Sequence, residues 1–321
     1  MLHTPLPEGS DKDAKITIGI PAYNERERIG FLLQNLLIQA NKDVAEIIVN
    51  AGGSTDGTID EVVKTARASQ NSSMIRLIAG KERMGKAAAL NDIVLQTTGD
   101  IIVFIDADTV VSKHCLNNIT EPFFIDEVIG VVSGNVLSLN DGDNLFSFIS
   151  KFQRQLHNEL CLYLRRKNLP PKVNGTFFAV RKGIVKGFPH HIVSDDEYAS
   201  LCAQRQGYKV VYVPEAMVYT KDPTNFKDYL TKRRRILGGH ISIKKSLNYT
   251  VPTTNFSTVS INFLRLALKH WRKMPHVVTM LLIEVVCHIL ALYDIIRGRV
   301  QYCYRVDSAK FHTEISVRHH K

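Results

Sequence analysis

The first hundred residues alternate between short apolar runs and longer segments with helical periodicity. Four strands are predicted, at 15–20, 46–50, 74–79 and 100–106, and three helices between them, at 25–40, 58–69 and 86–97. Alternation at this spacing favours right-handed βαβ units and a parallel sheet covered by helices. Ligands of such sheets bind beyond the carboxyl ends of the strands, so candidate site residues are expected there.

The pattern becomes less regular after about residue 128. Strands are predicted near 128–138, 172–181 and 208–214, and helices at 143–166 and 196–206. Two further helices are expected beyond residue 250. The second contains the run 277–293, in which only Glu284 and His288 are strongly polar. The length of 321 residues suits one large α/β domain with an appendage, or two modest domains.

The charge of the chain is concentrated in one segment. The formal net charge is +10, and the stretch from Lys221 to Lys273 holds twelve Lys or Arg against two Asp. A basic segment of this kind predicts an anionic partner, namely a phosphate group, a membrane surface or nucleic acid, with a solvated basic face as the alternative.

Five scattered cysteines without C-x-x-C spacing are expected to be reduced core residues. The polar N-terminal segment predicts a cytosolic folded part.

Two carboxylates follow the most apolar predicted strand. Asp106 and Asp108 come after IIVFI, and side chains two residues apart on an extended chain point to the same side. Oxygen ligands of this kind bind Mg²⁺ or Mn²⁺ together with diphosphate oxygens. The same spacing occurs at 11–13 and 141–143. The preceding buried strand, where a carboxylate is otherwise costly, therefore favours a metal site over a capping or solvated acid.

Seven motifs resemble glycosyltransferase family 2 in their order and spacing. They are IPAYNERERIG (20–30), NAGGSTDGT (50–58), RMGKAAALN (83–91), TGDIIVFIDADT (98–109), NGTFFAVRKG (174–183), SDDEY (194–198) and KRRRI (232–236). The resemblance covers about 15–240. Within the family, the chain is similar to the cellulose synthase and dolichol-phosphate sugar synthase group. It implies an α/β GT-A (Rossmann-like) fold with a mainly parallel sheet. It also implies inverting, divalent-metal-dependent transfer of a sugar from a nucleoside-diphosphate sugar.

The resemblance also implies a division of the chain into three parts. Residues 1–14 are expected to be a polar tail, and 15–245 the GT-A domain, with a nucleotide half at about 15–110 and an acceptor half at about 111–245. Residues 246–321 are expected to be a helical segment with a hydrophobic helix at about 276–296.

The donor site is assigned by the resemblance to the first strand ends and to the D-x-D motif. Tyr23 can stack on a flat base and Glu25 can accept a hydrogen bond from ribose, although Asn24 and Glu25 could instead cap the following helix. The remaining expected nucleotide contacts are Pro21, Gly53, Asp56, Lys86, Asp106 and Arg235. Many relatives carry an acidic pair where Ala51 and Gly52 stand here, so the sequence leaves the base undetermined.

The catalytic residues are assigned by the later motifs. Asp196 matches the family's catalytic base, with Asp195 as the alternative, and N-terminal helix capping is the structural explanation for both. Arg233 and Arg235 match the basic positions of the Gln-x-x-Arg-Trp type of motif. Ile236 replaces the tryptophan that stacks on a growing polymer, which predicts a single-transfer enzyme.

Other classes of protein fit the sequence less well. A sugar nucleotidyltransferase would need a glycine-rich, arginine-bearing loop after the first strand, and a nucleic-acid-binding protein would need a recognition motif. A catalytically silent membrane scaffold is disfavoured by the retained acids and arginines.

The expected acceptor is lipid-linked or a saccharide. Membrane association is expected through 255–300, by a spanning or an interfacial helix, with a soluble core helix as the alternative and the catalytic domain on the cytoplasmic face.

Overall fold

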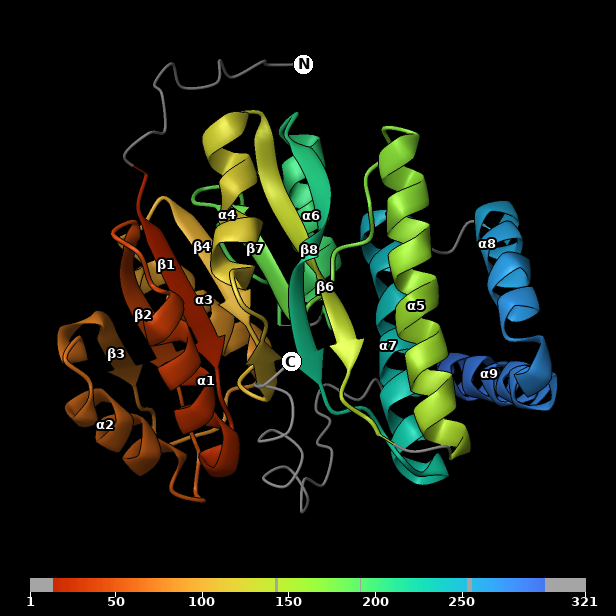
Figure 1. The fold of residues 1–321 in the computed structure, drawn as a ribbon, viewed down its shortest axis with the longest axis horizontal. Coiled ribbons are helices and arrows are strands. Elements are labelled where there is room, and N and C mark those ends of the chain that lie inside the picture. Colours follow the sequence, from red (N-terminus) through yellow and green to blue (C-terminus); the bar gives the residue numbers. More distant parts are fainter. Residues whose placement is uncertain (1–13, 142–143, 191, 253–255, 298–321) are drawn as a thin grey trace.

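A computed structural model shows one mixed sheet with helices on both faces and a group of helices along one side (Figure 1). The structure describes residues 14–141, 144–190, 192–252 and 256–297. Residues 1–13 of the tail predicted at 1–14 and the segment 298–321 lie outside the described residues. So do residues 142–143 of the second D-x-D spacing, at 141–143.

The N-terminal half forms the predicted parallel sheet. Its strands and helices are β1 (Ile16–Pro21), α1 (Arg26–Gln39), β2 (Val44–Asn50), α2 (Thr58–Ala68), β3 (Ile75–Ile78), α3 (Lys86–Gln96) and β4 (Ile101–Ile105), with a 3₁₀ turn, η2, at Ser72–Met74. These strands lie in the order β3-β2-β1-β4, all parallel. All seven predicted elements are confirmed, and each boundary lies within two residues of the prediction.

The second half extends the sheet in mixed orientation. Its elements are β5 (Thr109–Val111), α4 (Cys115–Ile125), β6 (Ile129–Ser138), α5 (Leu145–Arg166), β7 (Phe177–Arg181), α6 (Asp195–Arg205) and β8 (Lys209–Thr220). The order continues β4-β7-β6-β8-β5, with β7 antiparallel to both of its neighbours and β5 antiparallel to β8. The sequence pattern did not indicate β5 or α4. The strand predicted at 172–181 begins only at Phe177, and β8 runs six residues beyond its predicted end at 214.

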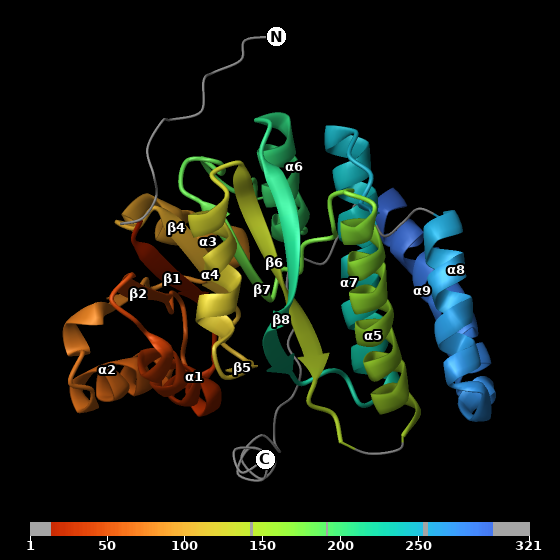
Figure 2. The same ribbon diagram turned by 45° about the horizontal axis from the view of Figure 1, so that its top comes forward.

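Two apolar layers hold helices on the two faces of the sheet (Figure 2). Alternate residues of β4 enter different layers: Ile101, Val103 and Ile105 pack towards α1 and α4, whereas Ile102 and Phe104 pack towards α3 and α6. This alternation is the period of an extended strand. The strand that precedes the D-x-D motif is therefore buried on both faces, as predicted.

A separate helical group lies beside the sheet. It consists of α5, α7 (Phe226–Leu247), α8 (Phe256–Lys269) and α9 (Met274–Ile296), with the 3₁₀ turn η4 (Trp271–Lys273) before α9. The two helices predicted beyond residue 250 are confirmed, whereas α7 was not predicted. Within the described residues one helical stretch, Trp271–Ile296, is long and apolar enough to cross a membrane by length and composition. Only 22% of its most apolar window is buried, unlike a soluble core helix.

Two loops at the carboxyl ends of β2 and β3 pack directly on each other. Gly53 has a φ of 74°, and its N–H donates a 2.8 Å hydrogen bond to the carbonyl oxygen of Gly80. A Cβ atom at Gly53 would lie 2.4 Å from the backbone nitrogen of Arg83. Glycine is therefore required here for both its conformation and its size.

We expect Gly53→Ala to lower the free energy of unfolding by about 2–4 kcal/mol, because left-handed strain adds to a backbone clash. Gly183→Ala is a matched control: its φ is 90°, yet no atom lies within 4 Å of the added Cβ. It should cost only about 1 kcal/mol of strain. Denaturant unfolding of both variants measures the difference, and equal losses would contradict the close packing of the two loops.

Candidate active site

A pocket of about 460 Å³ lies at the carboxyl ends of the parallel strands. Six predicted donor-site residues line it: Pro21, Tyr23, Glu25, Lys86, Asp106 and Arg235. They come from β1 and the loop after it, the start of α3, the end of β4 and the middle of α7. A larger cavity of about 930 Å³ lies between α4, α5 and β8, but it contains none of the predicted site residues.

The nucleoside side of the pocket contains an arginine that the motifs did not single out. The guanidinium carbon of Arg83 lies 3.8 Å from the ring centroid of Tyr23, within cation–π range. Arg83 therefore covers a face of the ring on which a base was predicted to stack. Glu25 pairs with the buried Arg28 at 2.9 Å. Arg83 is the first residue of the RMGKAAALN motif (83–91), but the sequence did not indicate its contact with Tyr23.

Two of the predicted nucleotide contacts, Gly53 and Asp56, are absent from the pocket lining. Asp56 accepts hydrogen bonds from the backbone nitrogens of Arg26 (3.2 Å) and Thr58 (3.0 Å), so it joins the N-terminal ends of α1 and α2. Burial alone would raise the pKa of Asp56, but these hydrogen bonds and that of the Thr58 hydroxyl lower it. The carboxylate is thus held by the first residues of α1 and α2.

Lys86 lies at the centre of the polar site. Its Nζ is 2.9 Å from Asp106 Oδ1 and 3.3 Å from Asp195 Oδ2, and it donates a 3.0 Å hydrogen bond to the carbonyl oxygen of Gly175. Burial alone would lower the pKa of Lys86, but the two carboxylates raise it. The lysine therefore stays charged and connects the D-x-D motif with the first residue of α6.

The two acids of the D-x-D motif lie in a site with few compensating charges. Arg28 is 3.8 Å from Asp108, and Lys86 pairs with Asp106. Burial and the neighbouring Asp106 carboxylate raise the pKa of Asp108. Over 14–141, 144–190, 192–252 and 256–297, no group of three or more His, Cys, Asp or Glu side chains could hold a metal ion without ligands from a bound molecule. A divalent cation here would thus take oxygen ligands from these two acids and the rest from the bound donor.

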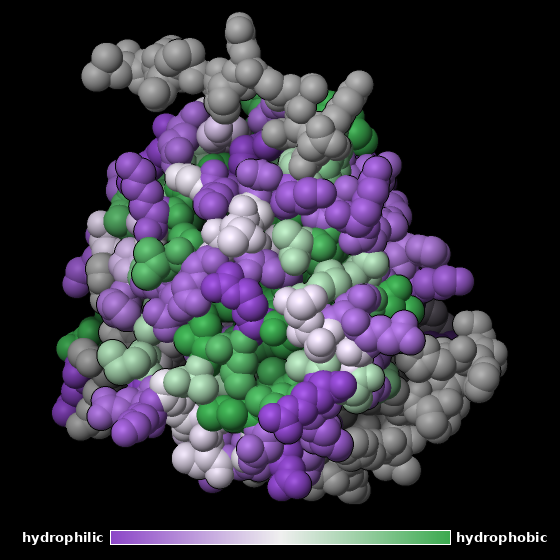
Figure 3. All heavy atoms as spheres, turned by 90° about the vertical axis from the view of Figure 1, so that its left-hand side faces the viewer, coloured by the Kyte–Doolittle hydropathy of each residue, from purple (hydrophilic) through white to green (hydrophobic). Residues whose placement is uncertain are grey.

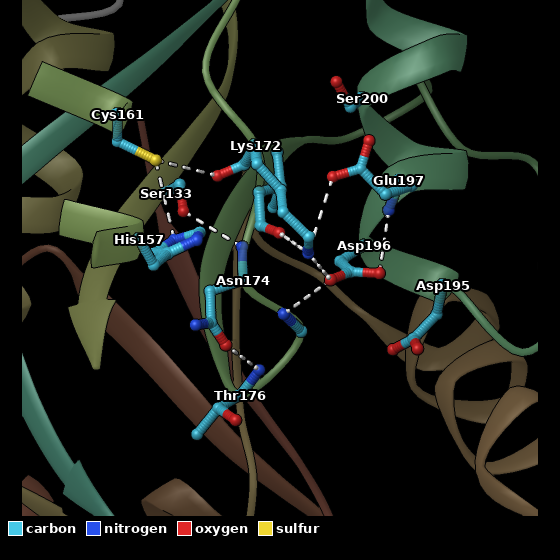
Figure 4. A network of polar contacts seen from close by, with 12 residues as sticks. Ser133, His157, Cys161, Lys172, Asn174, Thr176, Asp195, Asp196, Glu197 and Ser200 are labelled. Carbon is cyan, nitrogen blue, oxygen red and sulfur yellow. Dashed lines mark hydrogen bonds and ion pairs between the residues drawn. The ribbon is translucent and has the colours of Figure 1, made fainter. Parts of the chain in front are cut away.

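Asp196 is held in a defined orientation by its neighbours (Figure 4). Its Oδ2 accepts hydrogen bonds from the backbone nitrogen of Gly175 at 3.0 Å and from Lys172 Nζ at 3.4 Å, and its Oδ1 accepts one from the backbone nitrogen of Glu197 at 2.9 Å. Burial raises the pKa of Asp196, but Lys172 and the backbone donor outweigh it, so the net direction is downwards. The neighbouring Asp195 has its pKa raised, chiefly by burial. Of these two acids, Asp196 is therefore the one whose ionised form is favoured by its neighbours.

Buried titratable groups surround Lys172 on the side away from the pocket. Glu197 is fully buried with Oε1 3.7 Å from Lys172 Nζ, and burial raises the pKa of Glu197 to about 7. Burial likewise lowers the pKa values of His157 and His240 to about 3, so both imidazoles are neutral. Lys172 is thus the cation nearest to Asp196 in this cluster.

The four consecutive basic residues of α7 point to different partners. Lys232 pairs with Asp222 at 2.7 Å, Arg233 with Glu284 at 2.6 Å and Arg234 with Asp294 at 2.5 Å. Arg235 lines the donor pocket, and its buried Nε has no hydrogen-bond acceptor in the described part of the chain. The structure therefore brings Arg235 to the predicted site but holds Arg233 against α9.

The comparisons with known proteins identify relatives of this chain. A protein-family model described as "Glycosyltransferase like family 2" matches residues 14–239. The poly-β-1,6-N-acetyl-D-glucosamine synthase of Staphylococcus aureus (strain COL) is 28% identical over 264 residues, which is 80% of this chain and 62% of that protein. The probable glycosyltransferase YdaM of Bacillus subtilis (strain 168) is 26% identical over 235 residues, covering 70% and 55%. The chain thus spans less than two thirds of these relatives.

Solved structures share the fold. The mannosyltransferase PcManGT of Pyrobaculum calidifontis, solved with GDP-mannose and Mn²⁺, has a TM-score of 0.62 at 20% identity and covers 88% of both chains. The glucosyl-3-phosphoglycerate synthase of Mycobacterium tuberculosis, solved with Mn²⁺, UDP and phosphoglyceric acid, has a TM-score of 0.53 at 19% identity, covering 73% of this chain and 79% of that one. The expected GT-A fold is confirmed. With a family model matching most of its length, this chain belongs to glycosyltransferase family 2.

Proposed function

We propose that this glycosyltransferase transfers a sugar from a nucleoside-diphosphate sugar to a lipid-linked or saccharide acceptor, with inversion and with the help of Mg²⁺ or Mn²⁺. The observation that supports this most strongly is the convergence of Tyr23, Lys86, Asp106 and Arg235 on one pocket. An aromatic ring, two cations and a carboxylate match the base, the diphosphate and the hydroxyls of such a donor. Structural neighbours solved with nucleotides and Mn²⁺ support the same donor class.

The diphosphate is assigned to Arg235 and Lys86. Arg235 presents a buried donor without an acceptor, which a phosphate oxygen would satisfy. Lys86 is already charged and could exchange one of its carboxylate contacts for a phosphate oxygen. Asp106 and Asp108 would hold the divalent ion, whose charge would stabilise the departing diphosphate. This set of hard oxygen ligands fits Mg²⁺ or Mn²⁺.

The general base is assigned to Asp196. Its carboxylate is ionised and oriented by two backbone N–H groups and Lys172, so it can accept the proton of an acceptor hydroxyl as that oxygen attacks the anomeric carbon. Asp195 remains the alternative, since it lies beside Lys86 nearer the donor pocket. For Arg233 we propose a positioning role through Glu284, not contact with the donor.

Non-processive transfer is proposed because α7 carries Ile236 where a polymer synthase of this group would carry tryptophan. The poly-β-1,6-N-acetyl-D-glucosamine synthase matched by this chain is a longer protein, of which the match covers 62%. We therefore do not propose a polymer product for this chain.

We further propose that the catalytic domain lies on the cytoplasmic face of a membrane and that α8 and α9 attach it there. The exposed apolar residues of Trp271–Ile296 support this attachment.

We expect a screen of nucleotide sugars to find one donor that the protein hydrolyses slowly in the presence of Mn²⁺ or Mg²⁺. Asp108→Asn should reduce this turnover by about a hundredfold or more, because one metal ligand is lost. Release of the nucleoside diphosphate is the measurement. Undiminished hydrolysis in EDTA would contradict the metal, and hydrolysis of no nucleotide sugar would contradict the donor class.

We expect Asp196→Asn to retain donor binding but to lose transfer by about a thousandfold, because only proton acceptance is removed. Donor affinity by calorimetry and transfer rate, once an acceptor is known, separate the two effects. Asp195→Asn is the matched variant one residue away. If Asp195→Asn abolishes transfer while Asp196→Asn does not, the base must be reassigned.

We expect Lys172→Met to move the acidic limb of the kcat–pH profile to higher pH. Lys172 holds the pKa of Asp196 below its usual range, so without this cation the base is protonated at a higher pH. Activity should therefore be lost first at low pH and recover as the pH rises. Lys172→Arg should restore the original profile. An unchanged profile in a folded Lys172→Met variant would show that Lys172 does not control the base.

A further inference from the structure

The outer face of α9 is apolar apart from the exposed His288. Its exposed side chains include nine large hydrophobic residues, each 43% to 76% exposed: Val278, Leu281, Leu282, Val285, Val286, Ile289, Leu292, Tyr293 and Ile296. Both Figures 1 and 2 show α8 and α9 at the edge of the molecule beside α5 and α7. By contrast, the side facing away from them, seen in Figure 3, mixes many hydrophilic side chains with a hydrophobic area. A patch of this extent on α9 marks an interaction surface.

The opposite face of α9 is packed on the catalytic domain. Its buried residues are Val277, Met280, Cys287, Ala291 and Asp294. They recur at intervals of three, four or seven residues, which is one face of a helix. The stripe extends over about 26 Å at 1.5 Å per residue, so α9 is attached to the domain over nearly its whole length.

Two ion pairs fix this attachment. Glu284, near the middle of α9, receives hydrogen bonds from Arg233, Tyr229 and Gln153, and Asp294, near its end, pairs with Arg234. Separating α9 from α7 would leave two acids and two arginines without these partners, which is costly in hydrocarbon. If α9 spanned a bilayer with its packing intact, α7, with its clustered basic residues, would have to enter the membrane beside it.

We infer that α9 lies in the plane of the membrane surface and seats the catalytic domain on an anionic lipid bilayer. The inference rests on the membrane association proposed above and specifies its geometry. In this orientation the apolar face enters the boundary between headgroups and acyl chains, while the packed face and its ion pairs remain on the domain side.

Charged and aromatic residues around the apolar face favour lipid over a second copy of the chain. Arg272 just before α9 and Arg297 just after it are exposed, as are Arg265 and Lys269 on α8. The guanidinium carbon of Arg272 lies 5.3 Å from the ring centroid of Trp271, and that of Arg297 lies 5.1 Å from the ring centroid of Tyr293. Amphipathic aromatic rings beside cations suit the headgroup level, and exposed cations would repel in a symmetric contact but attract anionic lipid. The two arginine–aromatic pairs lie at the two ends of α9, and in this orientation both are at the headgroup level.

The single tryptophan of the chain makes this geometry measurable. We expect Trp271 emission to shift to the blue when vesicles containing phosphatidylserine are added to the full chain, and much less with phosphatidylcholine alone. Lipids brominated close to the headgroup should quench it more than lipids brominated at the end of the acyl chain. A second probe, Val285→Trp in a Trp271→Phe background, reports the middle of α9. Equal, shallow depths for both probes support the in-plane helix; a deep middle with shallow ends would overturn it in favour of a spanning helix.

Vesicle flotation tests the attachment separately. Leu282→Glu should weaken binding by about tenfold or more, because one leucine's transfer free energy is lost and a charge is added. Ile38→Glu is a matched control, since Ile38 is 82% exposed on α1, a helix on the far side of the molecule. If the wild-type chain does not float, or if both variants lose binding equally, the α9 surface is not the membrane contact. A concentration-dependent dimer without flotation would assign this face to a second copy. Donor hydrolysis in the same samples without vesicles reports the proposed activity independently.

Discussion

Lys86 holds the parts of the candidate active site together. Its ammonium group contacts the end of β4 through Asp106, the start of α6 through Asp195 and the loop before β7 through the Gly175 carbonyl. These segments lie far apart in the sequence and carry the proposed metal ligand and general base. Lys86 is only partly buried, and the two carboxylates beside it favour its charged form. The residues proposed for donor binding and those beside the proposed general base therefore share this one cation.

Four consecutive basic residues within about one turn of α7 have different partners. Successive helical residues differ by about 100° in direction, so Lys232, Arg233, Arg234 and Arg235 cannot share one partner. Arg235 reaches the donor pocket, while Arg233 and Arg234 bind acids of α9. The helix that contributes the proposed phosphate-binding arginine is thus the same helix that holds the proposed membrane-facing segment. The proposed seating of α9 on lipid would orient the donor pocket relative to the membrane surface.

The motifs at the ends of the parallel strands were predictable because the pattern that defines these strands lies in consecutive residues. β1 to β4 alternate with helices in a regular pattern, and strand ends meet at one edge, so Tyr23, Lys86 and Asp106 were expected to converge and do line one pocket. The elements that the pattern missed depend on distant partners. β5 is three residues long and exists by pairing with β8, and Arg83 reaches Tyr23 through a loop without periodicity. Gly53 and Asp56 belong to an expected motif, but their hydrogen bonds stay within the loops.

The sequence by itself determined the α/β architecture of the first half, the D-x-D acids at the end of a doubly buried strand, the family and a C-terminal helix of membrane-compatible length, because these follow from periodicity, apolar runs and motif order. The tertiary structure decided which of two adjacent acids has its pKa lowered, since Lys172 and the backbone of Gly175 approach Asp196 from distant parts of the chain. It also decided that Arg235 and not Arg233 faces the pocket, and that α9 is packed along one side. Those outcomes depend on which charged groups come within a few ångströms of each other, and only the folded chain brings them there.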